Sequence, residues 1–384
     1  MAKADTSVKW FHSNMPDAPV LSGTAGALIG LLDACLINGF STRTPDSVTV
    51  SGGVATVSIG AGNPYEKHAV IKITGASEPA LNSEWRIDSV TASAFTVLCP
   101  GVADGTATGA SIIRAPANWG KPFSGTNKAV YQSLDVAGTQ LYLRVDDSAA
   151  QYVPVRGYEN MTDIDTGTGP FPTTVQHALS AFTWRKSNAA SSAACPWVLV
   201  ADGAFLYFLP ASNAAQAGSP HMFGDIDAVL PSDAYHCMIV AHAASTFTHN
   251  GISHAGTSNS SLATAPRYLA RNAAQQAGPL LCKFFGLSSG NYFGGYDAPV
   301  APGLAGESYV GSPVFIQDGA SFSSPIRGRV PGLWSQLMRS QFGHLQMVGP
   351  GPDGRTWIAV NAIVGTSAVS TDDRILIDIT GPWR

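Results

Sequence analysis

Residues 118–172 read NWGKPFSGTNKAVYQSLDVAGTQLYLRVDDSAAQYVPVRGYENMTDIDTGTGPFP, and this stretch decides the predicted fold. It concentrates aromatic, charged and turn residues in a chain otherwise poor in charge. Residues 141–146 alternate apolar and polar side chains, which is typical of a half-buried strand. Residues 152–155 are predicted to pair with it across the turn at DDSAAQ, and Pro154 predicts that this partner is an edge strand. The stretch therefore predicts a β scaffold that carries polar loops.

The same two-residue period extends to both sides of this stretch. Between 44 and 115, Gly52 and Gly53 separate two β-branched runs, as in a tight hairpin. Asp202 and Gly203 join two runs that are apolar on both faces, which predicts a hairpin at the centre of a second domain. Further strands are predicted at 68–74, 85–91, 95–98, 110–113, 235–241, 309–317, 345–348, 356–363 and 374–379.

Two segments follow a helical period instead. Residues 24–39 (TAGALIGLLDACLING) have apolar positions at i, i+1, i+4 and i+5, and Gly39 is a natural C-terminal stop. We expect this helix to pack on its own domain, with docking on a neighbouring subunit as the alternative. Residues 173–185 predict a short amphipathic helix with Thr173 or Thr174 as its N-cap.

Together these patterns predict a mainly β protein with few short helices. An N-terminal segment with one helix covers 1–43, and a small antiparallel β-barrel or sandwich domain covers 44–116. A larger β-rich domain covers 117–384, with a further division near 250–306. Long Gly, Ser and Asn-rich loops are predicted at 249–261 and 285–306, and loops of that length are usually functional or ordered by a partner.

The composition bounds the class of protein. A hydrophobic share of 45% over 384 residues excludes a disordered chain. Charged residues make up only 12%, about half of the share typical of soluble domains. Such a low share is typical of secreted β-rich domains and of subunits that bury much of their surface in a permanent assembly. The net charge of −4, with Lys and Arg scattered singly, argues against nucleic acid as a direct ligand. The N-terminus lacks an apolar signal region and no apolar run would span a bilayer, so synthesis in a cytoplasm without membrane insertion is expected.

Sequence signatures of catalysis are missing from the chain. It has no Walker A, strand-to-helix G-x-G-x-x-G or H-E-x-x-H motif, and its one G-x-S-x-G match, GLSSG at 286–290, lies in a predicted Gly- and Ser-rich loop. We therefore predict no catalytic residue, no cofactor-binding residue and no enzymatic activity.

Metal ligands are not predicted either. Asp163, Asp165 and Gly167 resemble the start of a calcium loop, but Thr174 stands where the bidentate Glu is required, so Asx-turns are the favoured account. Four further candidates have spacings that fit no zinc pattern, namely His236, His242, His249 and His254. His68, at a strand start, is expected to be structural. The five cysteines form no CxxC pair and are predicted to be buried reduced thiols, with a nucleophile or metal ligand as the alternative.

Glycan binding or cleavage is the alternative function. Glycoside hydrolysis needs two carboxylates about 5 to 9 Å apart, and sugar binding favours aromatic platforms. The candidate residues for such a site are Asp146, Asp147, Glu159, Asp163 and Asp165, with the rings of Trp119, Tyr152 and Tyr158.

Several segments resemble virion structural proteins of tailed bacteriophages. They are EKHAVIKITGASEPALNSEWRIDSV (66–90), FTVLCPG (95–101), NWGKPFSGTNKAVYQS (118–133), LYLRVDD (141–147), VRGYENMTDIDTGTGPFP (155–172), MFGDID (222–227) and SPIRGRVPGL (324–333). The proteins concerned belong to tail-tip or baseplate assemblies.

This resemblance implies a structural role in a virion tail. A baseplate subunit is made in the host bacterial cytoplasm and joins other tail proteins and its own copies, as a trimer or hexamer. A cell-surface glycan is a further partner to consider. The interface charges implied are Arg144, Arg156, Glu159, Asp163 and Arg327. For each of them, a solvated surface or pairing within the chain is the alternative.

Overall fold

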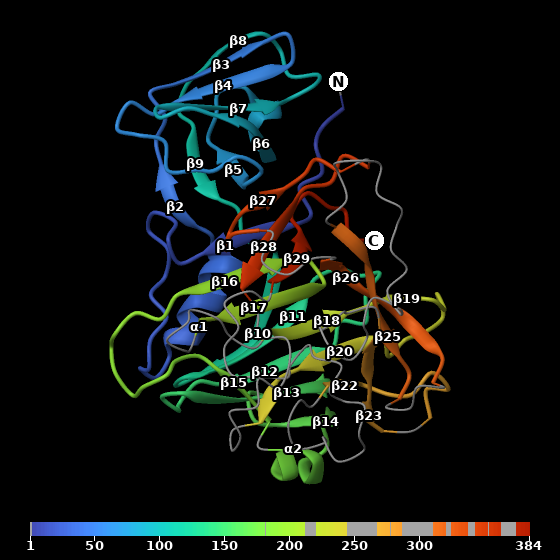
Figure 1. The fold of residues 1–384 in the computed structure, drawn as a ribbon. Helices are drawn as coiled ribbons and strands as arrows, with labels where there is room; N and C mark the ends of the chain where they lie inside the picture. The colour runs from blue at the N-terminus through green and yellow to red at the C-terminus, as the bar shows by residue number, and fades with distance from the viewer. Residues whose placement is uncertain are drawn as a thin grey trace.

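The fold was analysed in a computed structural model (Figure 1). The structure describes residues 2–180, 182–211, 220–243, 267–276, 278–285, 310–319, 324–336, 342–351, 353–361 and 374–384. The predicted mainly β class is confirmed, since the strands form antiparallel sheets and the helices are short. The loops predicted at 249–261 and 285–306 lie outside the described residues, apart from Phe285. Within the described part, no helix is both long and apolar enough to cross a membrane.

Residues 40–114 form an 8-stranded sheet at one end of the molecule (Figure 1). The predicted hairpin is confirmed, with Gly52 and Gly53 at φ 59° and 77° in the turn that joins its two strands. The curled sheet encloses its own core, which includes Val57, Ile71 and Val97. In order across the sheet, the strands are β2 (Phe40–Arg43), β9 (Ser111–Arg114), β5 (Val70–Thr74), β6 (Glu84–Val90), β7 (Ala94–Leu98), β4 (Val54–Ser58), β3 (Ser47–Ser51) and β8 (Gly105–Ala107).

A second sheet lies in the middle of the larger body. Its strands are, in order, β1 (Lys9–His12), β16 (Trp197–Ala201), β17 (Phe205–Pro210), β18 (His221–Asp225), β20 (Cys237–Val240), β22 (Arg267–Leu269) and β23 (Leu280–Leu281). The predicted β16–β17 hairpin is confirmed at its centre, and the Asp202 carboxylate closes its turn by accepting hydrogen bonds from the N–H groups of Ala204 and Phe205 at 2.8 and 2.7 Å. Through β1, the first residues of the chain join this sheet.

The stretch 118–172 builds most of a third sheet. Its strands are β10 (Trp119–Gly125), β11 (Lys128–Ser133), β12 (Tyr142–Asp146), β13 (Tyr152–Met161), β15 (Phe182–Arg185) and β21 (His242–Ala243), and β14 (Gly167–Phe171) pairs with β13. The predicted β12–β13 pairing is confirmed. The prediction that Pro154 marks an edge strand is wrong, because Pro154 lies opposite Thr183 of β15, so β13 has neighbours on both sides.

A fourth sheet holds the C-terminal residues. It consists of β24 (Lys283–Phe285), β25 (Val310–Gln317), β26 (Ile326–Gln336), β29 (Arg374–Asp378), β28 (Trp357–Asn361) and β27 (Met347–Val348), with the short β19 (Asp227–Ala228) paired to β26. The C-terminus packs against this body, because the Trp383 ring is buried and its indole N–H donates to the Asp378 carbonyl at 3.0 Å.

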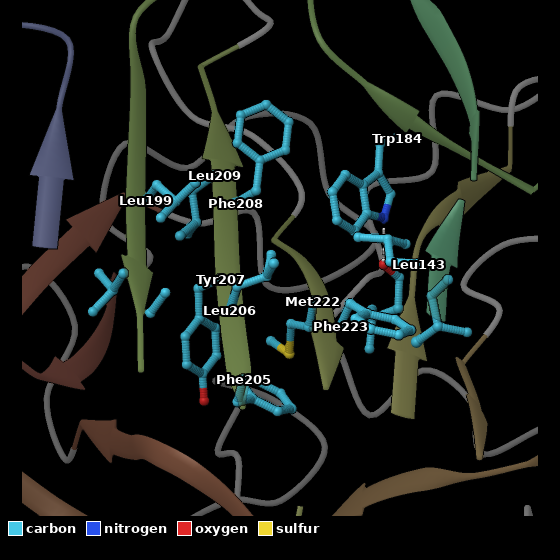
Figure 2. Close-up of a cluster of buried hydrophobic side chains, with 14 of the residues drawn as sticks. Leu143, Trp184, Leu199, Phe205, Leu206, Tyr207, Phe208, Leu209, Met222 and Phe223 are labelled. Atoms are coloured by element: carbon cyan, nitrogen blue, oxygen red, sulfur yellow. Dashed lines mark hydrogen bonds between the residues drawn. The ribbon is translucent and has the colours of Figure 1, made fainter. Parts of the chain in front are cut away.

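The central sheet is buried on both faces, as the apolar arms of β16 and β17 predict. On one side Trp184 packs 5.8 Å from Phe208, ring centre to ring centre, and joins the β10–β15 sheet to the core (Figure 2). On the other side Tyr207 packs edge-on against Trp383, at 5.6 Å. Because consecutive residues of β17 point to opposite faces, this one strand holds three layers together.

Two short helices accompany the sheets, and a single turn of 3-10 helix, Pro79–Leu81, precedes β6. Helix α1 (Ala27–Leu32) continues into a π-helical turn (Asp33–Asn38), and its leucines are buried in the main core, which confirms that it packs on its own domain. Helix α2 (Thr174–Ser180) begins with a capping box in which Thr173 and Gln176 exchange side-chain-to-backbone hydrogen bonds. The predicted helix to residue 185 is too long, because β15 pairs with β13 instead.

Arg86 of β6 fastens the small sheet to the two ends of the chain. Its guanidinium donates hydrogen bonds to the carbonyl oxygens of Asp5, Val8, His68 and Ile379, at 2.6 to 3.0 Å. Its side chain is buried. One side chain thus connects the small domain, the N-terminal segment and the C-terminal segment.

Candidate functional site

The outward side of β12 and β13 groups polar and aromatic side chains of the central stretch. Tyr142 lies directly opposite Tyr158, and Arg144 lies directly opposite Arg156. All four side chains are half-buried, whereas the alternating residues such as Leu143 point into the core. We call these four residues the β12–β13 face.

An ion-pair network neutralises one of the two arginines. Arg144 pairs with Asp165, and its Nε donates to the Ile164 carbonyl at 2.9 Å. Lys128 reaches the same carboxylate at 2.8 Å. The hydrogen bonds from Lys128 and Arg144 lower the pKa of Asp165. Lys128 and Arg144 therefore hold the loop at 162–166 against the sheet.

This arrangement accounts for the acidic residues that resemble a calcium loop. Asp165 is occupied by Lys128 and Arg144, and the Asp163 carboxylate accepts a hydrogen bond from the N–H of Ile164. Among the residues that the structure describes, no three His, Cys, Asp or Glu side chains gather in a way that could hold a metal ion.

Two other predicted interface charges are paired within the chain. Glu159 receives two hydrogen bonds from Arg271, each of 2.6 Å. Arg327 is buried and binds Asp233 at 2.6 Å and Asp318 at 2.9 Å. For these residues, and for Arg144, pairing within the chain is the alternative that the structure supports.

Arg156 differs from them. Its Nε is buried and has no hydrogen-bond acceptor among the residues that the structure describes. Its guanidinium carbon lies 6.0 Å from the centre of the Tyr158 ring, a distance compatible with a cation–π contact.

The rings suggested for sugar binding are not brought together. Trp119 is buried in the core, where its indole N–H donates to the Asp202 carbonyl at 2.7 Å. Tyr152 and Tyr158 are half-buried and sit beside Arg185 and Arg156. Of the candidate acids, Asp146 and Asp165 share Lys128 and Arg144 as ion-pair partners, whereas Asp147 is fully buried against Lys186. The structure therefore places these residues in several environments.

The histidines and cysteines have structural surroundings where they are described. His236 contacts the Asp233 carbonyl and lies 3.7 Å from the Asp225 carboxylate. Of the other three candidates, only the backbone of His242 is described, and His249 and His254 lie outside the described residues. All five cysteines are buried and reduced, as predicted. Burial raises the pKa of Cys282 to about 12, which keeps it a thiol at neutral pH.

Two features were missed by the sequence patterns. A cavity of about 210 Å³ between β16, β28 and the turn after β1 has Asn361 in its wall, and the Asn361 Oδ1 is buried without a hydrogen-bond partner. Large aliphatic side chains also lie exposed near β19, with Val229 61%, Leu230 54% and Ile326 37% accessible. The adjacent Val229 and Leu230, directly before Pro231, were the available sequence signal for the second feature.

His177 of α2 makes stability depend on pH. Burial, with Arg156 and Arg144 nearby, lowers its pKa to about 4. Below pH 6.5 His177 becomes protonated in the unfolded chain, whereas in the folded protein it stays neutral until about pH 4. The contribution of His177 to stability is therefore complete above pH 6.5 and is lost as the pH falls toward 4. Because solvent screens this partly exposed side chain, we expect His177 to account for only about 1–2 kcal/mol of the loss in stability. Urea unfolding at pH 7 and pH 4.5 measures it. His177→Gln should lose less stability than the wild type over this range, and an identical loss in both proteins would contradict the assignment.

Comparison with known proteins assigns no family to this chain. No family model matches the sequence, and no curated protein matches it. Among solved structures, the phage phi92 endosialidase is similar over 90% of this chain and 71% of that chain, at 8% sequence identity and a TM-score of 0.16. A similarity of this size carries no argument about fold or function.

Proposed function

We propose that this protein is a structural subunit of a tailed-phage virion, at the tail tip or baseplate, that acts by protein–protein assembly without catalysis. The observation that carries the proposal is the exposed aliphatic patch formed by Val229, Leu230 and Ile326. The backbone N–H of Val229 donates to the Arg327 carbonyl at 2.9 Å, which brings the first two residues beside the third. Clustered exposed aliphatic side chains are typical of protein interaction sites.

The internal pairing of charges supports the same proposal. A chain with only 12% charged residues has few charges for its surface, and several of these are used inside, as in the Arg327–Asp233 pair. Interface cores are depleted in charge in the same way. The resemblance of several segments to tail-tip and baseplate proteins provides the proposed location.

The mass of the purified protein in solution, alone and mixed with the virion proteins encoded beside it, tests the proposal. A trimer, a hexamer or a defined complex would support it. A stable monomer that binds none of those proteins would contradict the proposal. Glycan arrays would then test the alternative function.

Leu230→Glu is expected to weaken this assembly at least tenfold, because a carboxylate in an apolar interface must give up its hydration. Sedimentation velocity over a concentration series measures the change. Val20→Glu is the matched control, since Val20 is 64% exposed elsewhere on the chain. Equal assembly of the Leu230 variant and the wild type would exclude this patch from the interface.

Glycan binding stays the alternative function. A second cavity of about 210 Å³ is lined by Trp334 and Trp383 together with Arg329, Arg355 and Asp353. The half-buried Trp334 indole beside polar groups is the type of surface that binds sugars, whereas Trp383 is buried behind it. Among the described lining residues, Asp353 is the one carboxylate, and it pairs with Arg355 at 3.1 Å, so this lining supports binding better than two-carboxylate hydrolysis. A glycan array with wild type and Trp334→Ala tests it.

A further inference from the structure

The β12–β13 face contains a cation that no carboxylate of the described part of the chain neutralises. Arg156 is half-buried, and its Nε is buried without an acceptor. Among the residues that the structure describes, no carboxylate pairs with its two terminal nitrogens, and the side chain as a whole is partly exposed. Its one described contact is the Tyr158 ring. No carboxylate from the described residues therefore occupies the guanidinium fork.

The neighbourhood increases the electrostatic cost of this cation. Arg144 lies directly opposite on β12, and like charges in that position repel each other. His177 stays neutral at physiological pH and offers no negative charge. The two acidic residues at this face, Asp146 and Asp165, are both paired with Arg144 and Lys128. Glu159, three residues further along β13, is held by Arg271 through both of its oxygens.

Other arginines of the described chain have the kinds of partner that Arg156 lacks. Arg144, Arg271 and Arg327 each have a carboxylate, and Arg86 has four carbonyl oxygens. A half-buried guanidinium without either kind of partner gains most from a planar anion that accepts two parallel hydrogen bonds. The hydroxyl-bearing rings of Tyr158 and Tyr142 flank it on the same face and can border such a group.

We infer that Arg156 is a docking point for a carboxylate of a neighbouring subunit, bound through the guanidinium fork on the β12–β13 face. This inference rests on the proposed function for the source of the carboxylate. The presence of an anion site on the isolated chain does not depend on it. The two parts are therefore tested separately.

The first experiment probes the isolated chain with acetate. In protein labelled with ¹⁵N-arginine, the Nε–H signal of Arg156 is assigned by its loss in Arg156→Gln. Acetate, titrated against chloride at constant ionic strength, is expected to shift this signal along a saturating curve and to leave the Arg43 signal, from a surface pair with Asp17, in place. An unmoved Arg156 signal, or equal linear shifts of all arginines, would overturn the anion site whatever the function of the protein.

The second experiment measures assembly with the neighbouring virion proteins. Arg156→Gln is expected to weaken it at least tenfold, since a desolvated charge pair loses one partner. Arg156→Lys should restore part of the affinity, because it keeps the charge but not the fork. Arg43→Gln is the matched control and should assemble like the wild type.

A stability measurement separates docking from a structural role. The isolated Arg156→Gln chain should unfold at the same or a higher urea concentration than the wild type, since it loses the repulsion from Arg144 and, on the attractive side, only the long contact with the Tyr158 ring. A clear drop in its midpoint would assign Arg156 to the fold and overturn the inference. A saturating acetate shift with unchanged assembly would mean that the site takes free anions only, which would also overturn the docking role while leaving the proposed function open.

Discussion

Arg86→Gln is expected to lower the free energy of unfolding by about 3–5 kcal/mol, because it removes the donors of two buried and two partly buried carbonyl groups at once. The carbonyls belong to Asp5, Val8, His68 and Ile379. Glutamine has two donor hydrogens on a shorter side chain and cannot reach all four. Each orphaned carbonyl costs about 1–3 kcal/mol when water cannot replace the donor, and part of this is recovered by relaxation.

Lysine should not rescue this position. Burial lowers the pKa of Arg86 to about 10, opposed by the nearby Asp5 and Asp378, so the arginine remains charged at neutral pH. A lysine ammonium has three donors, and its pKa falls more readily on burial than that of arginine. Arg86→Lys is therefore expected to lose most of the same free energy.

Chemical unfolding followed by circular dichroism measures both variants, and limited proteolysis shows where the chain opens first. Cleavage is expected between the small sheet and the larger body, because Arg86 joins them. Arg43→Gln is the control, since its exposed pair with Asp17 contributes below about 1 kcal/mol. A loss of less than 1 kcal/mol in Arg86→Gln would mean that water satisfies these carbonyls.

Local patterns predicted the elements whose causes are local. The hairpin at Gly52 and Gly53, the arms of β16 and β17 and the cap at Thr173 follow from turn chemistry, apolar runs and a Thr–Gln spacing within a few residues. Each of these signals is complete within about ten residues of sequence. They were sufficient for the mainly β class.

The wrong or missing predictions concern strands whose partner strands lie far away in the sequence, because this pairing overrides the local pattern. Phe182 continues the apolar spacing of α2, yet β15 forms because Trp184 lies opposite Val153 and fills the core. Strand β1 is only four residues long, and its partner β16 lies far along the chain. Pro154 favoured an edge strand because nothing in the local sequence indicates that β15 pairs with β13 at this residue.

The candidate site was predictable in location but not in its contacts. The stretch 118–172 does supply the β12–β13 face. The ion pairs of this region depend on residues far away in the sequence. Arg271, for example, pairs with Glu159 from 112 positions away. The partners of Arg86 are backbone carbonyls, which every residue has and no sequence pattern marks.

Asp147→Ala is expected to destabilise the protein by about 3–5 kcal/mol, because it leaves the Lys186 ammonium buried without its counter-ion. Both side chains are fully buried and in contact. Lys186 also donates to the Thr24 carbonyl at 2.6 Å.

The same substitution removes the cap of a helix. Helix α1 has Gly26 at its N-cap position and no capping side chain of its own. The Asp147 carboxylate accepts hydrogen bonds from the N–H groups of Leu28 and Ile29 at 2.7 and 3.2 Å, so a residue 119 positions away supplies the cap. Loss of an N-cap costs about 1 kcal/mol.

A double-mutant cycle with Lys186→Met separates the two contributions. Each single variant leaves one buried charge alone, whereas the double variant removes both, so its loss should be smaller than the sum of the single losses by about 2–3 kcal/mol. Asp147→Asn with Lys186→Met should retain more stability still, because the asparagine side-chain oxygen can accept the hydrogen bonds at the start of α1. Strict additivity in urea unfolding would show that the two charges are solvated independently. In that case α1 would depend on Asp147 as a cap alone.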